Sequence, residues 1–304
     1  MTIQASIDLG TNTCLLLVME GEQVLGDFAK VVRLGEGVDQ HRLLQQAPME
    51  RTLSCLRNYS AQLRKLGGDP ARAVCVATSQ ARDARNSSDF FSQIQKETGF
   101  QFKVLSGEEE ARATFVGSLL PGLTPDKTWV IDIGGGSTEI ISLNHAQSVD
   151  LGSVRFTERF FKSTLASPDA VVKDEEFWAC QEAIDQALRE FRVPAHAQDT
   201  GFVAVAGTAT TLAAWYLNLE KFDSKKVDGL VLTRGDLHRM VEELKWRTVS
   251  ERSKLPGMEP LRADVLLAGC MILWRSLEVL GFSQCQVSTR GLRYGVIKTG
   301  SPTK

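Results

Sequence analysis

The chain has 304 residues, enough to bury a large core, and this length alone suggests two domains. Hydrophobic residues make up 43% and charged residues 24%, which is ordinary for a globular protein. The formal net charge of -2 argues against nucleic-acid binding through general basicity, so any polyanion must meet a local cluster of arginines or lysines.

The six cysteines are scattered, with no Cys-x-x-Cys pair, which favours small buried side chains in a reducing compartment. The four scattered histidines argue against a zinc site. The N-terminus lacks the basic stretch of a signal peptide, and the longest apolar run, 265–274, is far shorter than the roughly 20 residues that span a bilayer. We therefore expect a cytoplasmic protein.

The first part of the chain predicts strands that alternate with helices. Apolar patterning, prolines at helix starts and glycines at helix ends delimit these elements. In chain order we expect a hairpin of strands at 2–10 and 13–20, a helix at 48–66, a strand at 72–78, a helix ending at Gly99, a strand at 102–105 and a helix from Ser106.

A domain boundary is expected at 121–127, where two prolines and a glycine separate periodic segments. This predicts domains at 1–122 and 123–304. Beyond the boundary a second strand–glycine turn–strand begins, followed by helices near 174–192, 235–247 and 261–280 and by strands at 202–207 and 285–291. Strands alternating with helices indicate an α/β protein.

An internal repeat is the strongest organisational signal. The segment IDLGTNTCLLLV (7–18) aligns with IDIGGGSTEIIS (131–142), with Asp8 over Asp132. Two halves that each open with a strand, a glycine turn and a strand predict a duplicated fold with a cleft between the copies.

Glycine turns between strands let backbone amides reach an anion, so both turns are candidate phosphate sites. Neither is a Walker A loop, because no Gly-Lys-Ser/Thr occurs in them, and the dinucleotide fingerprint is absent. A third candidate is GTATT (207–211), which follows a strand and opens a helix. The predicted phosphate-binding residues are Gly10, Thr11, Asn12, Thr13, Gly134, Gly135, Gly136, Ser137, Thr138, Gly207 and Thr208.

Asp8 and Asp132 each end a predicted strand just before a glycine turn. A lone Asp here could simply cap its own turn. A carboxylate beside phosphate oxygens is repulsive unless a cation intervenes, so the symmetrical pair implies Mg²⁺ or another divalent cation.

The segment SGEEEAR (106–112) carries three consecutive glutamates. Ser106 and Glu109 have the spacing of a capping box, which is the structural explanation for acidic residues in a first helical turn. Spacing alone does not choose among Glu108, Glu109 and Glu110 as a catalytic base.

Arginines complete the set, because their planar fork suits phosphate. Arg82 and Arg85 are three residues apart and would share one face if their segment is helical. Further arginines lie beside turn or glycine-rich motifs: Arg112, Arg155, Arg262, Arg290 and Arg293.

Taken together, these segments resemble the exopolyphosphatase/guanosine pentaphosphate phosphohydrolase family, within the actin-like superfamily of duplicated ribonuclease-H-like domains. The similarity runs almost end to end, and its length suits the short, two-domain form. The matching segments are IDLGTNT, RLGEGV, ATSQARDARN, SGEEEAR, VIDIGGGSTEI, DLGSVRFTE, VAGTATTLAA, LPGMEPLRADVLLAG and VSTRGLRYG.

The resemblance implies that Glu110, directly before Ala-Arg, is the catalytic glutamate. It further implies phosphate turns at 8–13 and 132–138, and a metal ion held by Asp8, Asp132 and Glu110. The last residues, about 15 of them, are expected to pack back on the first domain. The family segment Gly-Leu-Arg-Glu-Gly here has Tyr294 in its fourth place, so the chain departs from the family pattern at this position.

The implied activity is exopolyphosphatase: Mg-dependent hydrolysis of the terminal phosphoanhydride of inorganic polyphosphate. The alternative is the 5′-phosphohydrolase that converts guanosine pentaphosphate (pppGpp) to the tetraphosphate alarmone of the stringent response. Aromatic residues form only 7% of the chain, which leans towards polyphosphate over a stacked purine. The expected partners are these substrates, with no nucleic acid and no membrane, and a homodimer is the candidate assembly. A small-molecule kinase and a filament-forming actin-like protein are the rival readings.

Overall fold

The structure, a computed structural model, describes residues 2–191 and 200–300. The last residue of the helix predicted at 174–192, the first residue of the first predicted domain and the last four residues of the second lie outside these residues. The chain divides into two compact units, one formed by 1–117 with 291–304 and the other by 118–290. Each unit is described separately.

The first unit is built on a five-stranded sheet of order β3-β2-β1-β4-β5. The predicted hairpin is confirmed, since β1 and β2 pair antiparallel with Leu9 opposite Cys14. β4 and β5 extend the sheet in parallel. The strands are β1 (Ile3–Leu9), β2 (Thr13–Glu20), β3 (Gln23–Val31), β4 (Val74–Ala77) and β5 (Phe102–Val104).

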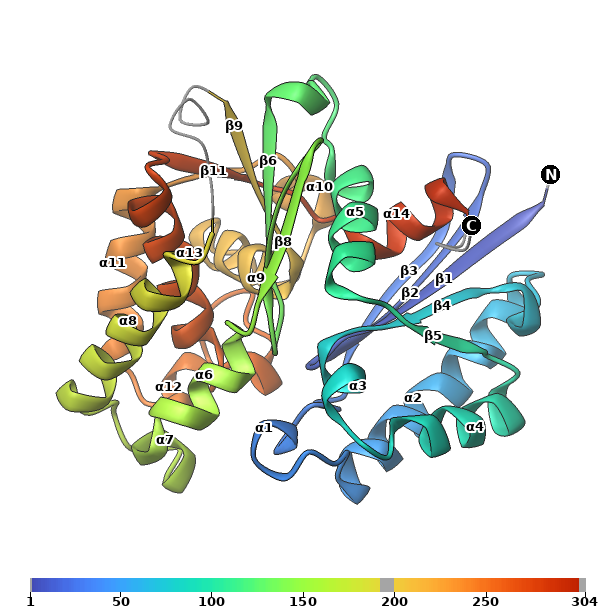
Figure 1. Ribbon diagram of the computed structural model, residues 1–304, viewed down its shortest axis with the longest axis horizontal. Coiled ribbons are helices and arrows are strands. Elements are labelled where there is room, and N and C mark those ends of the chain that lie inside the picture. The colour runs from blue at the N-terminus through green and yellow to red at the C-terminus, as the bar shows by residue number, and fades with distance from the viewer. Residues whose placement is uncertain (1, 192–199, 301–304) are drawn as a thin grey trace. The chain divides into compact units, whose positions relative to one another are not determined.

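Helices cover both faces of this sheet (Figure 1). α2 and α4 bury leucines, phenylalanines and an isoleucine against β1 and β2, whereas α5 and α14 form a smaller core with Val76 and Leu105. The helices are α1 (Val38–His41), α2 (Gln46–Lys65), α3 (Ser79–Asp83), α4 (Ser87–Thr98), α5 (Gly107–Ser118) and α14 (Leu292–Thr299), with a 3-10 turn at Pro70–Arg72.

The helices α5 and α14 approach closely through small residues. A Cβ added at Gly295 would lie 1.7 Å from the carbonyl oxygen of Ala113, and one at Gly117 would lie 2.0 Å from that of Gly291. Only glycine fits at these two positions, which allows α14 to pack closely on α5 within the first unit.

The second unit contains a six-stranded sheet of order β10-β11-β9-β6-β7-β8. β6, β7 and β8 form an antiparallel meander, and β9 joins β6 in parallel. The strands are β6 (Thr128–Ile133), β7 (Thr138–Ser142), β8 (His145–Val149), β9 (Gly201–Val205), β10 (Val231–Thr233) and β11 (Gln284–Val287).

The core of the second unit gathers around α13, which is buried along most of its length. The helices are α6 (Ser153–Phe160), α7 (Lys162–Ala166), α8 (Asp174–Leu188), α9 (Ala206–Tyr216), α10 (Ser224–Val227), α11 (Arg234–Lys245), α12 (Val249–Arg252) and α13 (Leu266–Leu280), with 3-10 turns at Pro125–Lys127 and Pro260–Arg262.

The two sheets share one design. In each, a three-stranded antiparallel meander is extended in parallel from its first strand, through β4 and β5 in one unit and β9 and β11 in the other. The predicted α/β fold of duplicated ribonuclease-H-like units is therefore confirmed. In the described part of the chain, no helix combines the length and the apolar character needed to cross a bilayer.

Candidate functional site

The first glycine turn is closed by its own backbone. The amide of Gly10 donates to the carbonyl oxygen of Thr13 at 2.9 Å. The segment after β3 backs the turn, because the amides of Val32 and Arg33 both donate to Asn12 and the amide of Gly35 donates to Thr11. The amide of Gly10 is thus engaged within the turn, so anion binding here would depend on its neighbours.

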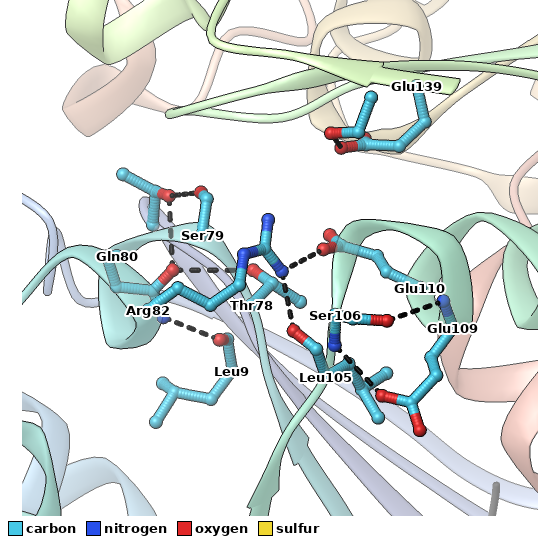
Figure 2. Close-up of polar contacts among 12 residues, drawn as sticks. Leu9, Thr78, Ser79, Gln80, Arg82, Leu105, Ser106, Glu109, Glu110 and Glu139 are labelled. Atoms are coloured by element: carbon cyan, nitrogen blue, oxygen red, sulfur yellow. Dashed lines mark hydrogen bonds and ion pairs between the residues drawn. The ribbon is translucent and has the colours of Figure 1, made fainter. Parts of the chain in front are cut away.

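Side chains of the segment after β4 brace the same turn (Figure 2). The Thr11 hydroxyl lies 3.0 Å from the Ser79 hydroxyl and donates to Oε1 of Gln80 at 3.2 Å. The Gln80 amide in turn donates to the carbonyl oxygen of Leu9 at 2.7 Å. Thr11 is only 6% exposed, and within the described residues Oδ1 of buried Asn12 has no hydrogen-bond partner.

The second glycine turn repeats this backbone pattern. The amide of Gly134 donates to the carbonyl oxygen of Ser137 at 2.9 Å. The amides of Val154 and Arg155 donate to Gly135, and Nε of Arg155 donates to the carbonyl oxygen of Gly136 at 2.7 Å. The start of α6 therefore holds the second turn as the segment after β3 holds the first.

Gly152 explains another part of the matching segment DLGSVRFTE. A Cβ at this position would lie 2.2 Å from the carbonyl oxygen of Gly135 and 2.4 Å from the carbonyl carbon of Gly136. Its backbone is extended, with φ −130°, so glycine is required by contact and not by conformation. Ser137 and Thr138 are both buried, and the Thr138 hydroxyl donates to the carbonyl oxygen of Leu151.

The two predicted metal-binding aspartates occupy equivalent positions, at the ends of β1 and β6. Burial of the Asp8 carboxyl raises its pKa to about 6, against the opposing charge of Arg293. Opposite Asp8 on β2 lies Leu15, whereas opposite Asp132 on β7 lies Glu139. Directly paired residues of an antiparallel ladder point to the same face, so Asp132 and Glu139 are adjacent carboxylates.

Glu139 is a candidate residue that sequence reasoning missed. It is 1% exposed and accepts a hydrogen bond from the Ser148 hydroxyl at 2.6 Å. The register of the hairpin formed by β6 and β7, which pairs Glu139 with Asp132, could have identified this residue.

The donor chemistry of these positions fits a hard divalent cation. Two like charges opposite each other on a ladder destabilise it unless a cation or a proton intervenes. The charged form of the Asp8 carboxyl is disfavoured by burial, which raises its pKa, so a nearby cation would stabilise this group as well. Among the residues that the structure describes, however, no three His, Cys, Asp or Glu side chains converge in a ready metal cluster.

The structure separates the three consecutive glutamates. Glu108 is exposed and pairs with Arg112 at 2.6 Å. Glu109 forms the predicted capping box, accepting from the amide of Ser106 at 2.9 Å while its own amide donates to the Ser106 hydroxyl. Glu110 alone is buried, with 7% exposure.

An arginine fixes Glu110 in place. Nη1 of Arg82 donates to Oε2 of Glu110 at 2.8 Å and to the carbonyl oxygen of Leu105 at 2.7 Å (Figure 2). Arg85 does not share this position, because α3 ends at Asp83 and the next residue is extended. We predicted that Arg82 and Arg85 would share one face if their segment is helical, but α3 is too short to include Arg85.

The third predicted phosphate segment lies at the start of α9. Ala206 takes a left-handed conformation, φ 67°, which ends β9 and turns the chain into the helix, so Gly207 and Thr208 lie in its first turn. A Cβ on Gly207 would lie 1.5 Å from Nη1 of Arg262. Burial lowers the pKa of Arg262 to about 10, so this guanidinium is still charged at neutral pH.

Tyr294 has a structural partner in the first unit. Its hydroxyl donates to Asp27 at 3.2 Å, and Arg293 binds the same carboxylate with two nitrogens at 2.9 Å each. The carbonyl oxygen of Arg293 accepts from the Ser6 hydroxyl. These contacts attach α14 to the sheet.

Comparison with known proteins gives a consistent result. The sequence model of the Ppx/GppA phosphatase family matches residues 18–303. A bifunctional 3-dehydroquinate synthase/phosphatase of Fusobacterium nucleatum is 31% identical over 99% of this chain and 47% of its own length, so the chain spans about half of that relative.

Two solved structures are similar over nearly the whole chain. An exopolyphosphatase from Cytophaga hutchinsonii has a TM-score of 0.84 and 25% identity, covering 98% of this chain and 97% of that one. The Ppx/GppA enzyme of Aquifex aeolicus has a TM-score of 0.78 and 29% identity, covering 98% of this chain and 99% of that one.

Proposed function

Because the chain belongs to the Ppx/GppA phosphatase family, we propose that it is an exopolyphosphatase that removes the terminal phosphate of inorganic polyphosphate. Membership of this phosphatase family supports a phosphoanhydride hydrolase activity. The similarity to the Cytophaga exopolyphosphatase supports the choice of polyphosphate. The observation on which the proposal depends most is Glu110, the one buried carboxylate of three consecutive glutamates.

Glu110 is proposed as the general base. Its carboxylate accepts the proton of a water molecule that attacks the terminal phosphorus in line with the leaving phosphate oxygen. Arg82 holds the carboxylate in one orientation, which a base needs if it is to reach a single water. Removing a positioned base typically costs about 10² to 10⁴ in rate.

The glycine turns and the start of α9 are proposed to bind phosphate oxygens. The first amides of a helix have no acceptor within the helix, and α9 presents Gly207 and Thr208 at this end beside the Arg262 guanidinium. In the two turns the amides of Gly10 and Gly134 are already engaged, so we assign the binding to the residues between them and the next strand.

Mg²⁺ or another divalent cation is proposed as the cofactor, with Asp8, Asp132 and Glu110 as its candidate ligands and Glu139 as an addition to that set. When bound, such a cation would neutralise non-bridging phosphate oxygens. The carboxylates would hold the cation, while the proton is still taken up by Glu110.

The test is a phosphate-release assay with long-chain polyphosphate and guanosine pentaphosphate side by side, each with and without Mg²⁺. We expect Mg-dependent release from polyphosphate at a kcat/KM at least tenfold above that for the nucleotide. A preference for the nucleotide would replace the proposal by the alternative activity. Transfer of phosphate to a small acceptor, or no release from either substrate, would exclude both.

A further inference from the structure

A cluster of polar contacts attaches α14 to the edge strand of the first sheet. The Arg293 guanidinium donates two hydrogen bonds of 2.9 Å to the carboxylate of Asp27 on β3, and the Tyr294 hydroxyl donates to the same carboxylate at 3.2 Å. Two-nitrogen pairing of this kind fixes orientation as well as distance. On β1, the Ser6 hydroxyl donates to the carbonyl oxygen of Arg293 at 2.7 Å. The start of α14 is therefore held on two strands.

The register of the sheet shows how these contacts span it. Ser6 lies opposite Leu17 on β2, and Leu17 lies opposite Asp27 on β3. Residues paired in this way point to the same face of an antiparallel sheet, so the three lie in a row under the start of α14. Leu17 is fully buried, whereas the Asp27 side chain is 30% exposed. The Arg293 residue thus reaches from β1 across the sheet to a carboxylate at its edge.

The same helix packs on α5, which carries Glu110. At Gly295 and Gly117 the backbones of the two helices approach so closely that no Cβ fits between them. Apolar side chains of both helices share one small core, and Figure 1 shows the helices side by side. Close-packed backbones cannot slide independently, so a displacement of α14 is passed on to α5.

Glu110 is held from two directions. Its carboxylate accepts a hydrogen bond from Arg82 on α3. Its backbone lies one helical turn before Ala113, whose carbonyl oxygen is the atom that Gly295 of α14 approaches. Arg82 therefore fixes the carboxylate, and α14 fixes the helix from which it projects. A catalytic base must lie within hydrogen-bond reach of its water, and a misplacement of about 1 Å can cost about 10² in rate.

We propose that Asp27 is a positioning residue for Glu110: it anchors Arg293 at the sheet edge, which sets the position of α14 and, through α14, of α5. This inference rests on the proposed function of Glu110 as the general base. A partly exposed ion pair at a sheet edge is ordinarily of little consequence. Here, loss of the Asp27 charge should slow the chemical step and leave substrate binding intact.

The first unit offers a matched ion pair as a control. Nε of Arg57 on α2 donates to Glu97 on α4 at 2.9 Å, and the Glu97 side chain is 29% exposed, against 30% for Asp27. The helices α2 and α4 pack in the larger core of this unit, whereas α5 and α14 share the smaller one. Glu97→Gln therefore measures what the loss of such a pair does to the unit in general.

Steady-state phosphate release from polyphosphate is the first measurement. We expect Asp27→Asn to lower kcat about tenfold with KM within about twofold of wild type, and Asp27→Glu to restore kcat to within about threefold. Glu97→Gln should change neither constant by more than about twofold. In the Glu110→Gln background Asp27→Asn should have no further effect, because the group that it positions is already gone. An unchanged kcat for Asp27→Asn, equal losses in both backgrounds, or a rise in KM alone would overturn the proposal.

Hydrogen exchange of the backbone amides at 110–117 tests the positioning without relying on activity. We expect exchange there to be about fivefold faster in Asp27→Asn and unchanged in Glu97→Gln. Should Asp27→Asn fail to fold, Tyr294→Phe removes one hydrogen bond of the same cluster and should lower kcat about threefold. Unchanged exchange at 110–117 would overturn the proposal, whereas faster exchange in a chain whose wild type releases no phosphate from polyphosphate would contradict the proposed function alone.

Discussion

The two glycine turns share a backbone but not the contacts that hold it. In both, a glycine amide donates to the carbonyl oxygen three residues on, at 2.9 Å, and a later segment of the same unit donates amides into the turn. The first is braced by side chains, through the Thr11–Ser79–Gln80 network. The second is braced by backbone against backbone at Gly152, with the Arg155 guanidinium on Gly136. Duplication has preserved the turn, while its supports have diverged.

The carboxylates around the turns have diverged as well. Asp8 faces Leu15 across the hairpin, whereas Asp132 faces Glu139. The first unit instead has Glu110, supplied by α5 and held by Arg82. The first turn therefore accompanies the candidate base, and the second accompanies a pair of adjacent carboxylates suited to a cation.

The largest effect on this comparison is expected from adding a methyl group to one glycine behind each turn, Gly152 or Gly35. Gly152→Ala places a methyl group within 2.4 Å of backbone atoms that cannot rotate away, whereas Gly35→Ala meets the Thr11 side chain at 2.2 Å. We expect Gly152→Ala to lower the free energy of unfolding by about 3 kcal/mol or more and phosphate release at least tenfold, and Gly35→Ala to cost about 1 kcal/mol. Urea unfolding and kinetics measure both. Equal effects would show that the two supports are equivalent.

Asp8 should make stability depend on pH. The pKa of Asp8 is raised to about 6 in the folded protein, above the value of 3.8 for an exposed Asp. In strongly acidic solution the carboxyl is protonated in both the folded and the unfolded state, so its burial does not lower the free energy of unfolding. This free energy falls as the pH rises through about 6, because the buried carboxyl must then be charged. In metal-free buffer, Asp8→Asn should match wild type at low pH and exceed it by about 2–3 kcal/mol at pH 8. Urea unfolding across this range is the measurement. An Asp8→Asn variant that is less stable than wild type at pH 8 would contradict the assigned cause.

Thr11→Val should have the smallest effect. It keeps the shape of the side chain and removes a hydroxyl that contacts Ser79 and Gln80, so we expect a loss of about 1 kcal/mol. Thr138→Val is the matched change in the second turn, where the hydroxyl donates to the carbonyl oxygen of Leu151. Thermal unfolding compares the pair. A cost above about 3 kcal/mol for Thr11→Val would mean that the network determines the turn rather than braces it.

Local signals predicted much of this molecule. The hairpin around the first turn, the helix ending at Gly99 and the capping box of Ser106 with Glu109 all depend on residues close in sequence. The edge strands β3 and β8 were not predicted. β3 combines a glycine, charged residues and extensive exposure, so it lacks the apolar alternation of a buried strand.

The supports of the site depend on contacts between distant segments. Arg82 reaches Glu110 across 28 residues, and Arg155 reaches Gly136 across 19. The prediction that Arg82 and Arg85 share one helical face was wrong, because α3 ends at Asp83 and does not include Arg85. No local pattern encodes such pairings, which depend on how strands and helices pack.

The measurement that tests the account most directly is the rate of phosphate release by Glu110→Gln, with Glu109→Gln as its matched control. Both changes remove one charge from the same turn of α5, but only Glu110 is buried on Arg82. We expect Glu110→Gln to lose about 10² to 10⁴ in kcat while polyphosphate binding is retained, and Glu109→Gln to stay within about threefold of wild type. Near-normal phosphate release by Glu110→Gln would contradict the account.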